Sequence, residues 1–191
     1  MADIPIAGSD HEHFASIPWC ARHLRSSKSG SRIITRSPEC RSRKSSGEDS
    51  LYSETLKSRA TIMAMLEVYE EPPSPEEPIN SVKAFLTLGP GLNGYPNVCH
   101  GGIVVTILDE VIGLLIPVNQ QRKFMPDLPY MTAYLNTKFL KPVPTCATVL
   151  ARARIVKLEG RKFRAEAWIE DGNGNMLARA DALFLAIKSA L

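Results

Sequence analysis

The 191-residue sequence has few cysteines and histidines, and their spacing excludes several kinds of site. The cysteines are Cys20, Cys40, Cys99 and Cys146. They form no Cys-x-x-Cys pair, which argues against a zinc site and against a disulfide framework, so we expect free thiols. Two of the four histidines form the pair His11-x-His13, which has no third ligand nearby and is more typical of a polar surface than of a metal site.

Long apolar segments are also missing. The longest apolar run, residues 103–118, is interrupted by a threonine and two carboxylates and falls short of the ~20 residues that a membrane span needs. The first ten residues carry Asp3 and Asp10 and no apolar segment, unlike a signal peptide or an acid-poor transit peptide. We therefore expect no membrane span and a cytoplasmic protein, with a mitochondrial location as the alternative.

The composition, 44% hydrophobic and 23% charged, is that of a globular protein with one domain. We expect an N-terminal extension over residues 1–50. Within it, residues 11–25 are predicted to form a short helical segment, broken near Pro18, that packs on the domain. Residues 26–50 contain nine serines and little apolar surface, which predicts a flexible basic linker. Because the basic stretch has no aromatic side chains to stack on bases, we expect no nucleic-acid partner.

The domain is predicted over residues 51–191, beginning with a helix and a strand. A second strand follows over residues 79–89, and a Gly/Pro/Asn-rich loop leads into one apolar helix. A polar loop over residues 119–129 then precedes successive antiparallel strands. We place these strands near residues 130–140, 146–158, 161–171 and 176–187. The pattern predicts an α+β fold, with a long central helix wrapped by an antiparallel sheet.

The apolar helix carries an unusual stripe. Ten of the fourteen residues 103–116 are apolar, so the helix is expected in the core. At 3.6 residues per turn, Gly102, Thr106, Asp109 and Gly113 lie on one face, where a ligand rather than protein can approach. Glu110 lies about 100° away, so it is expected at a rim or an interface.

Two interpretations of this stripe stay open. Asp109 is either a functional carboxylate or a buried acid held by a hydroxyl or backbone partner. Gly101 and Gly102 either offer free helix N-terminal N–H groups to a carbonyl oxygen on which negative charge develops, or simply allow a tight turn into the helix.

The motif His100-Gly101-Gly102, six residues and then Asp109 is followed by the strand MTAYLNTKFLKPVP and the hairpin KLEGRKF. This order of motifs, over residues 60–188, resembles the PaaI-like hotdog-fold acyl-CoA thioesterases. Within that family it is similar to the thioesterase superfamily member 4 type and its fungal relatives. The resemblance implies a hotdog fold, a homodimer or homotetramer with sites between subunits, and hydrolysis of acyl-CoA or acyl-carrier thioesters without a metal or cofactor.

The resemblance also implies roles for individual residues. Asp109 matches the acid that activates water or attacks as nucleophile, Gly101 the backbone donor that polarises the carbonyl, and Thr132 the hydroxyl that positions the water. His100 is expected to hold the loop, with Gly102 beside it. Further substrate-binding candidates are Asn93, Asn97 and Gly113, and for the coenzyme A phosphates Lys138, Lys141, Arg161 and Lys162.

Two other functions are consistent with the same pattern. A hotdog dehydratase acting on 3-hydroxyacyl thioesters would need a histidine paired with an aspartate, and His100 is the one histidine within the domain. A non-catalytic acyl-CoA-binding module would be favoured if Asp109 were engaged in an internal ion pair.

Overall fold

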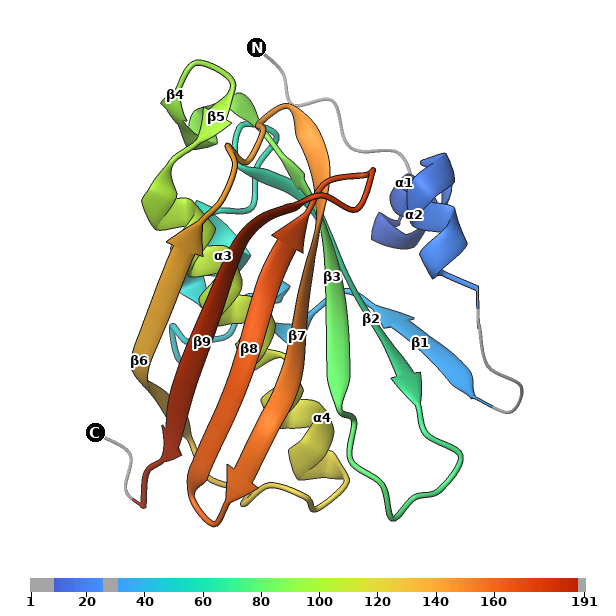
Figure 1. Ribbon diagram of the computed structural model, residues 1–191, viewed down its shortest axis with the longest axis vertical. Coiled ribbons are helices and arrows are strands. Elements are labelled where there is room, and N and C mark those ends of the chain that lie inside the picture. The colour runs from blue at the N-terminus through green and yellow to red at the C-terminus, as the bar shows by residue number, and fades with distance from the viewer. Residues whose placement is uncertain (1–8, 26–30, 189–191) are drawn as a thin grey trace.

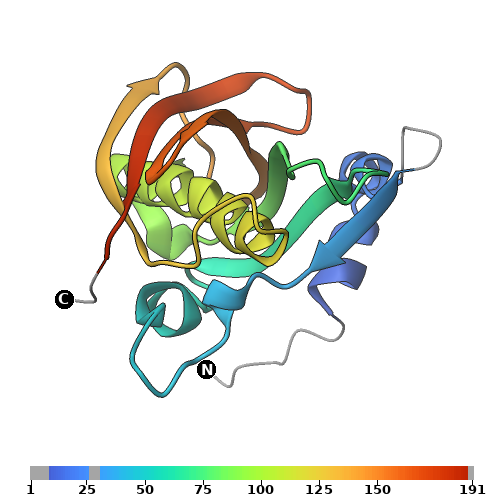
Figure 2. The ribbon, with the colours of Figure 1, turned by 90° about the horizontal axis from the view of Figure 1, so that it is seen from below.

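The computed structural model describes residues 9–25 and 31–188. An antiparallel sheet of seven strands, in the order β1-β2-β3-β7-β8-β9-β6, curves around the helices α3 and α4 (Figures 1 and 2). The strands are β1 (Arg32–Arg36), β2 (Ile62–Glu71), β3 (Ser81–Leu88), β6 (Tyr130–Phe139), β7 (Ala147–Glu159), β8 (Lys162–Glu170) and β9 (Met176–Ala186), with a separate hairpin of β4 (Asn93–Tyr95) and β5 (Val98–Cys99). The helical elements are α1 (Asp10–Ala15), α2 (Pro18–His23), η1 (Glu39–Arg41), η2 (Leu51–Thr55), η3 (Pro90–Leu92), α3 (Gly101–Gly113) and α4 (Leu115–Gln121).

The predicted α+β class, with a sheet around a central helix, is confirmed. The central helix forms because its apolar residues cover nearly the whole circumference, so it is stable only inside the sheet. Val104, Ile107, Leu108, Val111 and Ile112 are all buried there. The four C-terminal strands lie within a residue or two of their predicted bounds. The predicted 119–129 loop is shorter at its start, because α4 continues the helical path to Gln121.

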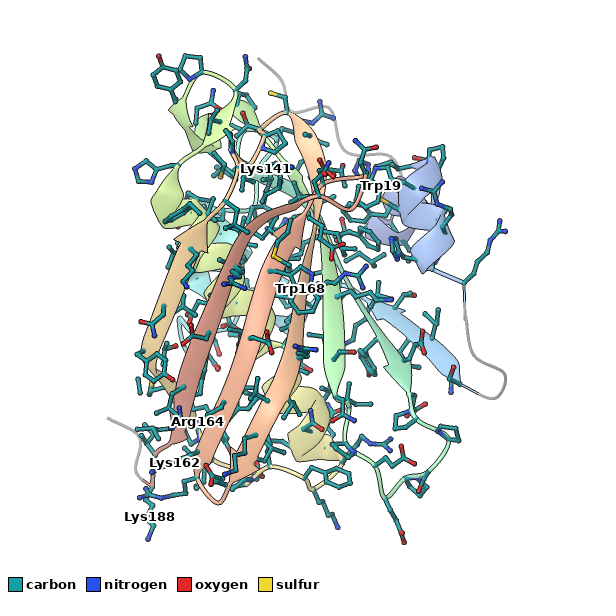
Figure 3. All side chains as sticks on the ribbon, in the orientation of Figure 1. Trp19, Lys141, Lys162, Arg164, Trp168 and Lys188 are labelled. Atoms are coloured by element: carbon teal, nitrogen blue, oxygen red, sulfur yellow. The ribbon has the colours of Figure 1, made fainter. Side chains whose placement is uncertain are left out.

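The N-terminal helices pack on the outer face of the sheet, as expected. Pro18 is the first residue of α2, where its missing N–H costs no hydrogen bond, and it separates α2 from α1. Phe14 is fully buried against Phe85 of β3, with ring centroids 5.5 Å apart. Trp19 also packs on Phe85, with ring centroids 5.6 Å apart, and lies beside the β8–β9 turn (Figures 1 and 3).

The predicted flexible linker is wrong for residues 31–50. β1 pairs antiparallel with β2, and η1 buries Cys40 and Arg41. The Arg41 guanidinium donates to the backbone carbonyls of Tyr52, Leu56 and Ile62 at 2.9–3.2 Å. Basic, serine-rich composition indicated no driving force for order, but here one arginine satisfies three buried acceptors. Residues 26–30 of the predicted linker lie outside the described residues.

Candidate active site

The start of α3 is capped by its own motif histidine. His100 is the N-cap residue, and its Nδ1 accepts a hydrogen bond from the Gly102 N–H at 3.0 Å. The N–H of Gly101, the first helical residue, has no hydrogen-bond acceptor among the described residues. Such first-turn amides carry the positive end of the helix dipole. Gly101 is therefore placed to bind a carbonyl oxygen, whereas Gly102 uses its N–H to fix His100.

Asp109 lies two turns further along the helix and is held by the neighbouring strand. Thr132 Oγ1 of β6 donates to Asp109 Oδ1 at 2.9 Å. Burial raises the pKa of Asp109 above its usual range, and the hydrogen bond from Thr132 opposes that increase. A carboxylate that is less acidic than normal and oriented by a hydroxyl is well suited to accept a proton from water.

A β-bulge in β6 gives Thr132 its direction. Thr132 lies opposite the inward-facing Phe184 of β9, but the register shifts before the next pair, Tyr134 and Leu183. A bulge of one residue reverses the alternation of side chains. Thr132 therefore faces the helix while Tyr134 and Lys138 face outward, although simple alternation would place all three on one side.

One chain does not bring the two main catalytic candidates together. Gly101 and Asp109 are eight residues apart on one continuous helix, which at 1.5 Å per residue separates them by about 12 Å along the axis. A water activated by Asp109 must attack a carbonyl within about 3.5 Å. The Gly101 amide and the Asp109 carboxylate of the same chain therefore cannot act on the same thioester.

A cavity of about 450 Å³ opens beside Asp109 and Thr132. It follows the C-terminal half of α3 and all of α4, past Gly113, where the space of an added Cβ would be free of other atoms within 4 Å. Its other walls come from the β6 entry and from the segment 36–49. Of the predicted stripe, Asp109 and Gly113 line this cavity, whereas Thr106 donates its hydroxyl to the Gly102 carbonyl instead.

Glu110, which we expected at a rim or an interface, instead lines this cavity and is partly buried. Burial raises the pKa of Glu110 to about 7, and Asp49 and Asp109 add to the increase. The Cys40 thiol from η1 lines the same cavity and acts on the Glu110 carboxyl group so as to lower its pKa. The adjacent carboxylates were visible in the sequence, but nothing in the serine-rich segment around Cys40 indicated that it would face Glu110.

The predicted asparagines lie in the loop before the helix and bind another loop. The Asn93 side chain accepts a hydrogen bond from the Thr145 hydroxyl. The Asn97 backbone adopts a positive φ of 61°, and its carbonyl accepts from the Thr145 N–H at 3.2 Å. Both residues therefore hold the β4–β5 hairpin against residues 143–146. Neither side chain forms a hydrogen bond with Asp109 in the described part of the chain.

The four cations predicted for the coenzyme A phosphates are spread over the domain. Lys138 faces the outer side of the sheet, in a hollow with Trp168 and Asp181. Arg161 and Lys162 lie at the β7–β8 turn, and Arg161 donates to the Ala186 carbonyl. Lys141 lies at the opposite end of the sheet from Lys162 (Figure 3). Within one chain these four candidates do not form a single phosphate site.

The direction of β6 shows which of the four predicted phosphate-binding cations lies nearest the start of α3. Phe139 contacts Gly101, because a Cβ on that glycine would lie 3.5 Å from the Phe139 ring, whereas the Tyr130 end of β6 is next to Ala186 and Arg161. The two ends of this ten-residue strand are about 30 Å apart at ~3.3 Å per residue. Lys141, two residues after Phe139, is thus the candidate at the Gly101 end.

Two further properties of the described chain bear on the site. Among residues 9–25 and 31–188, no group of three or more His, Cys, Asp or Glu side chains is arranged to hold a metal.

The stretch Gly101–Gln121 is long and apolar enough, by length and composition, to cross a membrane, but a buried core helix meets the same criterion. The expected absence of a membrane span stays a prediction.

Sequence comparisons identify related proteins. A family model described as thioesterase superfamily matches residues 96–178. Verlamelin biosynthesis protein B of a Lecanicillium species is 30% identical over 161 residues, which cover 69% of this chain and 70% of that protein. Acyl-coenzyme A thioesterase THEM4 of Bos taurus is 38% identical over 75 residues, but these cover 39% of this chain and 27% of that protein.

Solved structures share the fold. A Bacillus halodurans protein crystallised with CoA is 26% identical, with a TM-score of 0.50 over 57% of this chain and 69% of that one. Zebrafish thioesterase superfamily member 2 has a TM-score of 0.51 at 14% identity, over 59% of this chain and 78% of that one, and shows the fold alone. The chain therefore belongs to the thioesterase superfamily and has the hotdog fold.

Proposed function

We propose that this chain hydrolyses acyl thioesters of coenzyme A or of an acyl carrier, with Asp109 as the general base. The observation that carries the proposal is the hydrogen bond from Thr132 to Asp109 at the mouth of a cavity large enough for an acyl chain. Asp109 removes a proton from water, and the water oxygen bonds to the thioester carbonyl carbon. The carbon–sulfur bond then breaks, and the departing thiolate takes up the proton.

The second part of the proposal is that each site combines two subunits. The carbonyl oxygen needs a donor such as the Gly101 N–H, which lies about 12 Å along the helix from Asp109 of its own chain. In a two-fold dimer, Gly101 of one subunit can meet Asp109 of the other, and the converse pair forms a second, identical site. A homodimer, alone or within a tetramer, is thus required for activity.

The free edge of β6 is the proposed contact between the subunits. β6 is the last strand of the sheet and spans ten residues, and Met131, Tyr134 and Phe139 are 47%, 37% and 57% exposed. A long edge strand with exposed apolar side chains readily pairs with another chain. Because Thr132 lies on this same strand, such pairing would place the partner next to Asp109.

Mixed dimers test the composite site. Gly101→Pro removes the N–H donor, while proline suits the first position of a helix and His100 already has the extended backbone (φ −59°, ψ 135°) that proline requires of its predecessor. Asp109→Asn removes the base. Each variant alone is expected to lose at least 100-fold in kcat. Co-assembled in equal amounts, the two should recover about a quarter of wild-type activity, since about half the dimers are mixed and each has one intact site.

The outcomes separate the two parts of the proposal. Loss of activity in both single variants without recovery in mixed dimers would show that the composite site is wrong, although the base assignment would stand. If Asp109→Asn kept wild-type turnover, Asp109 would not be the base. If the wild-type protein hydrolysed neither acyl-CoA nor carrier-bound thioesters but bound acyl-CoA, the non-catalytic binding function would replace hydrolysis.

The dehydratase alternative has less support in the structure. His100 Nδ1 is engaged with the Gly102 N–H, and His100 precedes Asp109 by nine residues of the same helical path. No histidine of the described chain is hydrogen-bonded to Asp109, whose partner is Thr132. The internal ion pair of Asp109 that would favour a non-catalytic acyl-CoA-binding module is likewise not found among the described residues.

A further inference from the structure

The cavity beside Asp109 has a wall that lies outside the segment matched by the family model. The model matches residues 96–178, whereas this wall consists of Arg36 at the end of β1, Cys40 in η1, and the loop to Asp49. The same stretch is anchored by the buried Arg41 and by Tyr52, whose hydroxyl donates to the Thr106 carbonyl of α3 at 3.0 Å. The wall is therefore a fixed part of the domain.

This wall makes one end of the cavity strongly polar. Six carboxyl groups and two cations line the cavity: Glu39, Glu48, Asp49, Glu67, Asp109 and Glu110 against Arg36 and Lys44. Both cations are already paired, Arg36 with Glu67 at 2.8 Å and Lys44 with Asp49 at 2.7 Å. A plain hydrocarbon chain would remove water from these groups without replacing its hydrogen bonds, and an anionic chain would be repelled.

The far end of the cavity is apolar. Beyond Gly113 its lining includes Leu114, Ile116, Pro117, Leu128 and Pro129, and it ends near Gln120. From Asp109 to Gln120 the helical path rises by about 16 Å at 1.5 Å per residue. Since the thioester is attacked beside Asp109, the part of the acyl chain next to the thioester lies among polar groups and its tail lies among apolar ones.

Glu110 and Cys40 are the polar residues that we place beside the thioester-proximal part of the acyl chain. Glu110 follows Asp109 directly in the sequence, and the Cys40 thiol lines the same cavity as both carboxyl groups. With its pKa at about 7, Glu110 is partly protonated at neutral pH, while burial keeps the Cys40 thiol neutral by raising its pKa well above the usual range. A carboxyl and a thiol in these states can each donate or accept a hydrogen bond.

We propose that the acyl chain of the substrate carries an uncharged hydroxyl group in its thioester-proximal half, and that Glu110, backed by Cys40, binds this hydroxyl. The inference rests on the proposed hydrolysis and assigns its substrate class: hydroxylated acyl thioesters with an apolar tail. Binding is selective because a saturated chain would exclude water from the Glu110 carboxyl group without offering it a hydrogen bond in return.

The test compares thioesters of equal chain length. Wild-type protein is assayed for thiol release from a saturated acyl-CoA and from a series in which one hydroxyl, in either configuration, moves along the chain. One hydroxyl position in the proximal half is expected to give at least a tenfold higher kcat/KM than the saturated chain. An equal or higher kcat/KM for the saturated chain, or for a chain ending in a carboxylate, would overturn the inference.

Variants locate the selectivity. The hydroxyl preference is the ratio of kcat/KM for the best hydroxylated chain to kcat/KM for the saturated chain. Glu110→Leu should reduce this ratio to within about threefold of unity. Glu110→Gln, whose side chain still donates and accepts hydrogen bonds, should keep most of it. Glu166→Gln on the outer face of the sheet is the matched control, because Glu166 pairs with Arg154 away from this cavity. A hydroxyl preference that Glu110→Leu leaves unchanged would overturn the assignment of Glu110.

Binding measurements keep the inference separate from hydrolysis. If no thioester is cleaved, the same compounds are compared by the shift in melting temperature that they cause. A larger shift for the hydroxylated chain than for the saturated chain would support the selectivity while overturning hydrolysis. Equal shifts, or none, would overturn both.

Discussion

Replacing Glu110 with glutamine should remove a loss of stability that the wild-type protein suffers as the pH rises. Glu110 has a pKa of about 7 in the folded protein, against 4.5 for the free side chain, chiefly because burial disfavours its charged form. Each pKa unit corresponds to about 1.4 kcal/mol, so ionised Glu110 costs the folded state up to about 3 kcal/mol. Glutamine fills the same space and can still accept a hydrogen bond, but it never ionises.

The sign of this effect follows from proton binding. Between pH 4.5 and about 7 the folded state holds the Glu110 proton more tightly than the unfolded state, so this residue lowers the free energy of unfolding as the pH rises through that window. Below the window the variant and the wild type should be similarly stable. Above it, Glu110→Gln should be more stable by up to about 3 kcal/mol.

Urea unfolding at pH 4.5, 5.5, 6.5, 7.5 and 8.5 measures the difference between the two proteins. Titrating groups that are not coupled to Glu110, including the buried Glu67, contribute equally to both proteins and cancel in that difference. Glu166→Gln on the sheet surface is the control and should show no such trend. Parallel stability curves for wild type and Glu110→Gln would refute the reasoning, because they would mean that Glu110 ionises as easily in the folded protein as in the unfolded chain.

Three further outcomes are expected. Thr132→Ala should lower kcat about 10- to 100-fold and move the acidic limb of the kcat/KM pH profile to higher pH, because the Thr132 hydroxyl opposes the raised pKa of Asp109. Thr132→Ser should restore both kcat and the position of the limb. An acidic limb that does not move in Thr132→Ala would contradict the hydrogen bond. Arg41→Met should cost about 2–4 kcal/mol in urea unfolding, since three buried carbonyls lose their donor; a cost below 1 kcal/mol would contradict its anchoring role. Phe14→Ala should cost about 3–5 kcal/mol by the same measurement if the N-terminal helices are docked on Phe85, and a neutral effect would show that they are not.

Much of the domain could be predicted from the sequence because its elements carry strong periodic signals. The strands of the C-terminal meander alternate and end at turn residues such as the Asp171–Asn175 stretch, and the apolar run of α3 has no other stable place than inside a sheet. The N-terminal segment had no such signal. Its order depends on Arg41 and Tyr52 meeting backbone acceptors far along the chain, and composition cannot show contacts of that kind.

The site shows the same limit at a finer scale. Helical spacing placed Asp109 and Gly113 on the face that lines the cavity, and the strand containing Thr132 does lie beside them. The β-bulge after Thr132, which turns Lys138 to the opposite face, was not accessible from the sequence. The eight-residue spacing of Gly101 and Asp109 was visible, but the spacing alone does not show what completes the site. Spacing along one element gives direction, but it does not give the partner on another element or another subunit.

The structure also connects the stability of the N-terminal segment with substrate choice. Arg41 and Cys40 are neighbours in one turn of 3-10 helix, and they point to different partners: Arg41 to the carbonyls that end η2, and Cys40 to Glu110 in the cavity. A substitution at Arg41 therefore displaces the thiol that supports Glu110, although Arg41 itself is not among the residues that line the cavity. If Glu110 and Cys40 bind a substrate hydroxyl, Arg41→Met should weaken the hydroxyl preference in kcat/KM more than it weakens hydrolysis of the saturated chain. Equal loss on both substrates would instead confine Arg41 to a purely structural role.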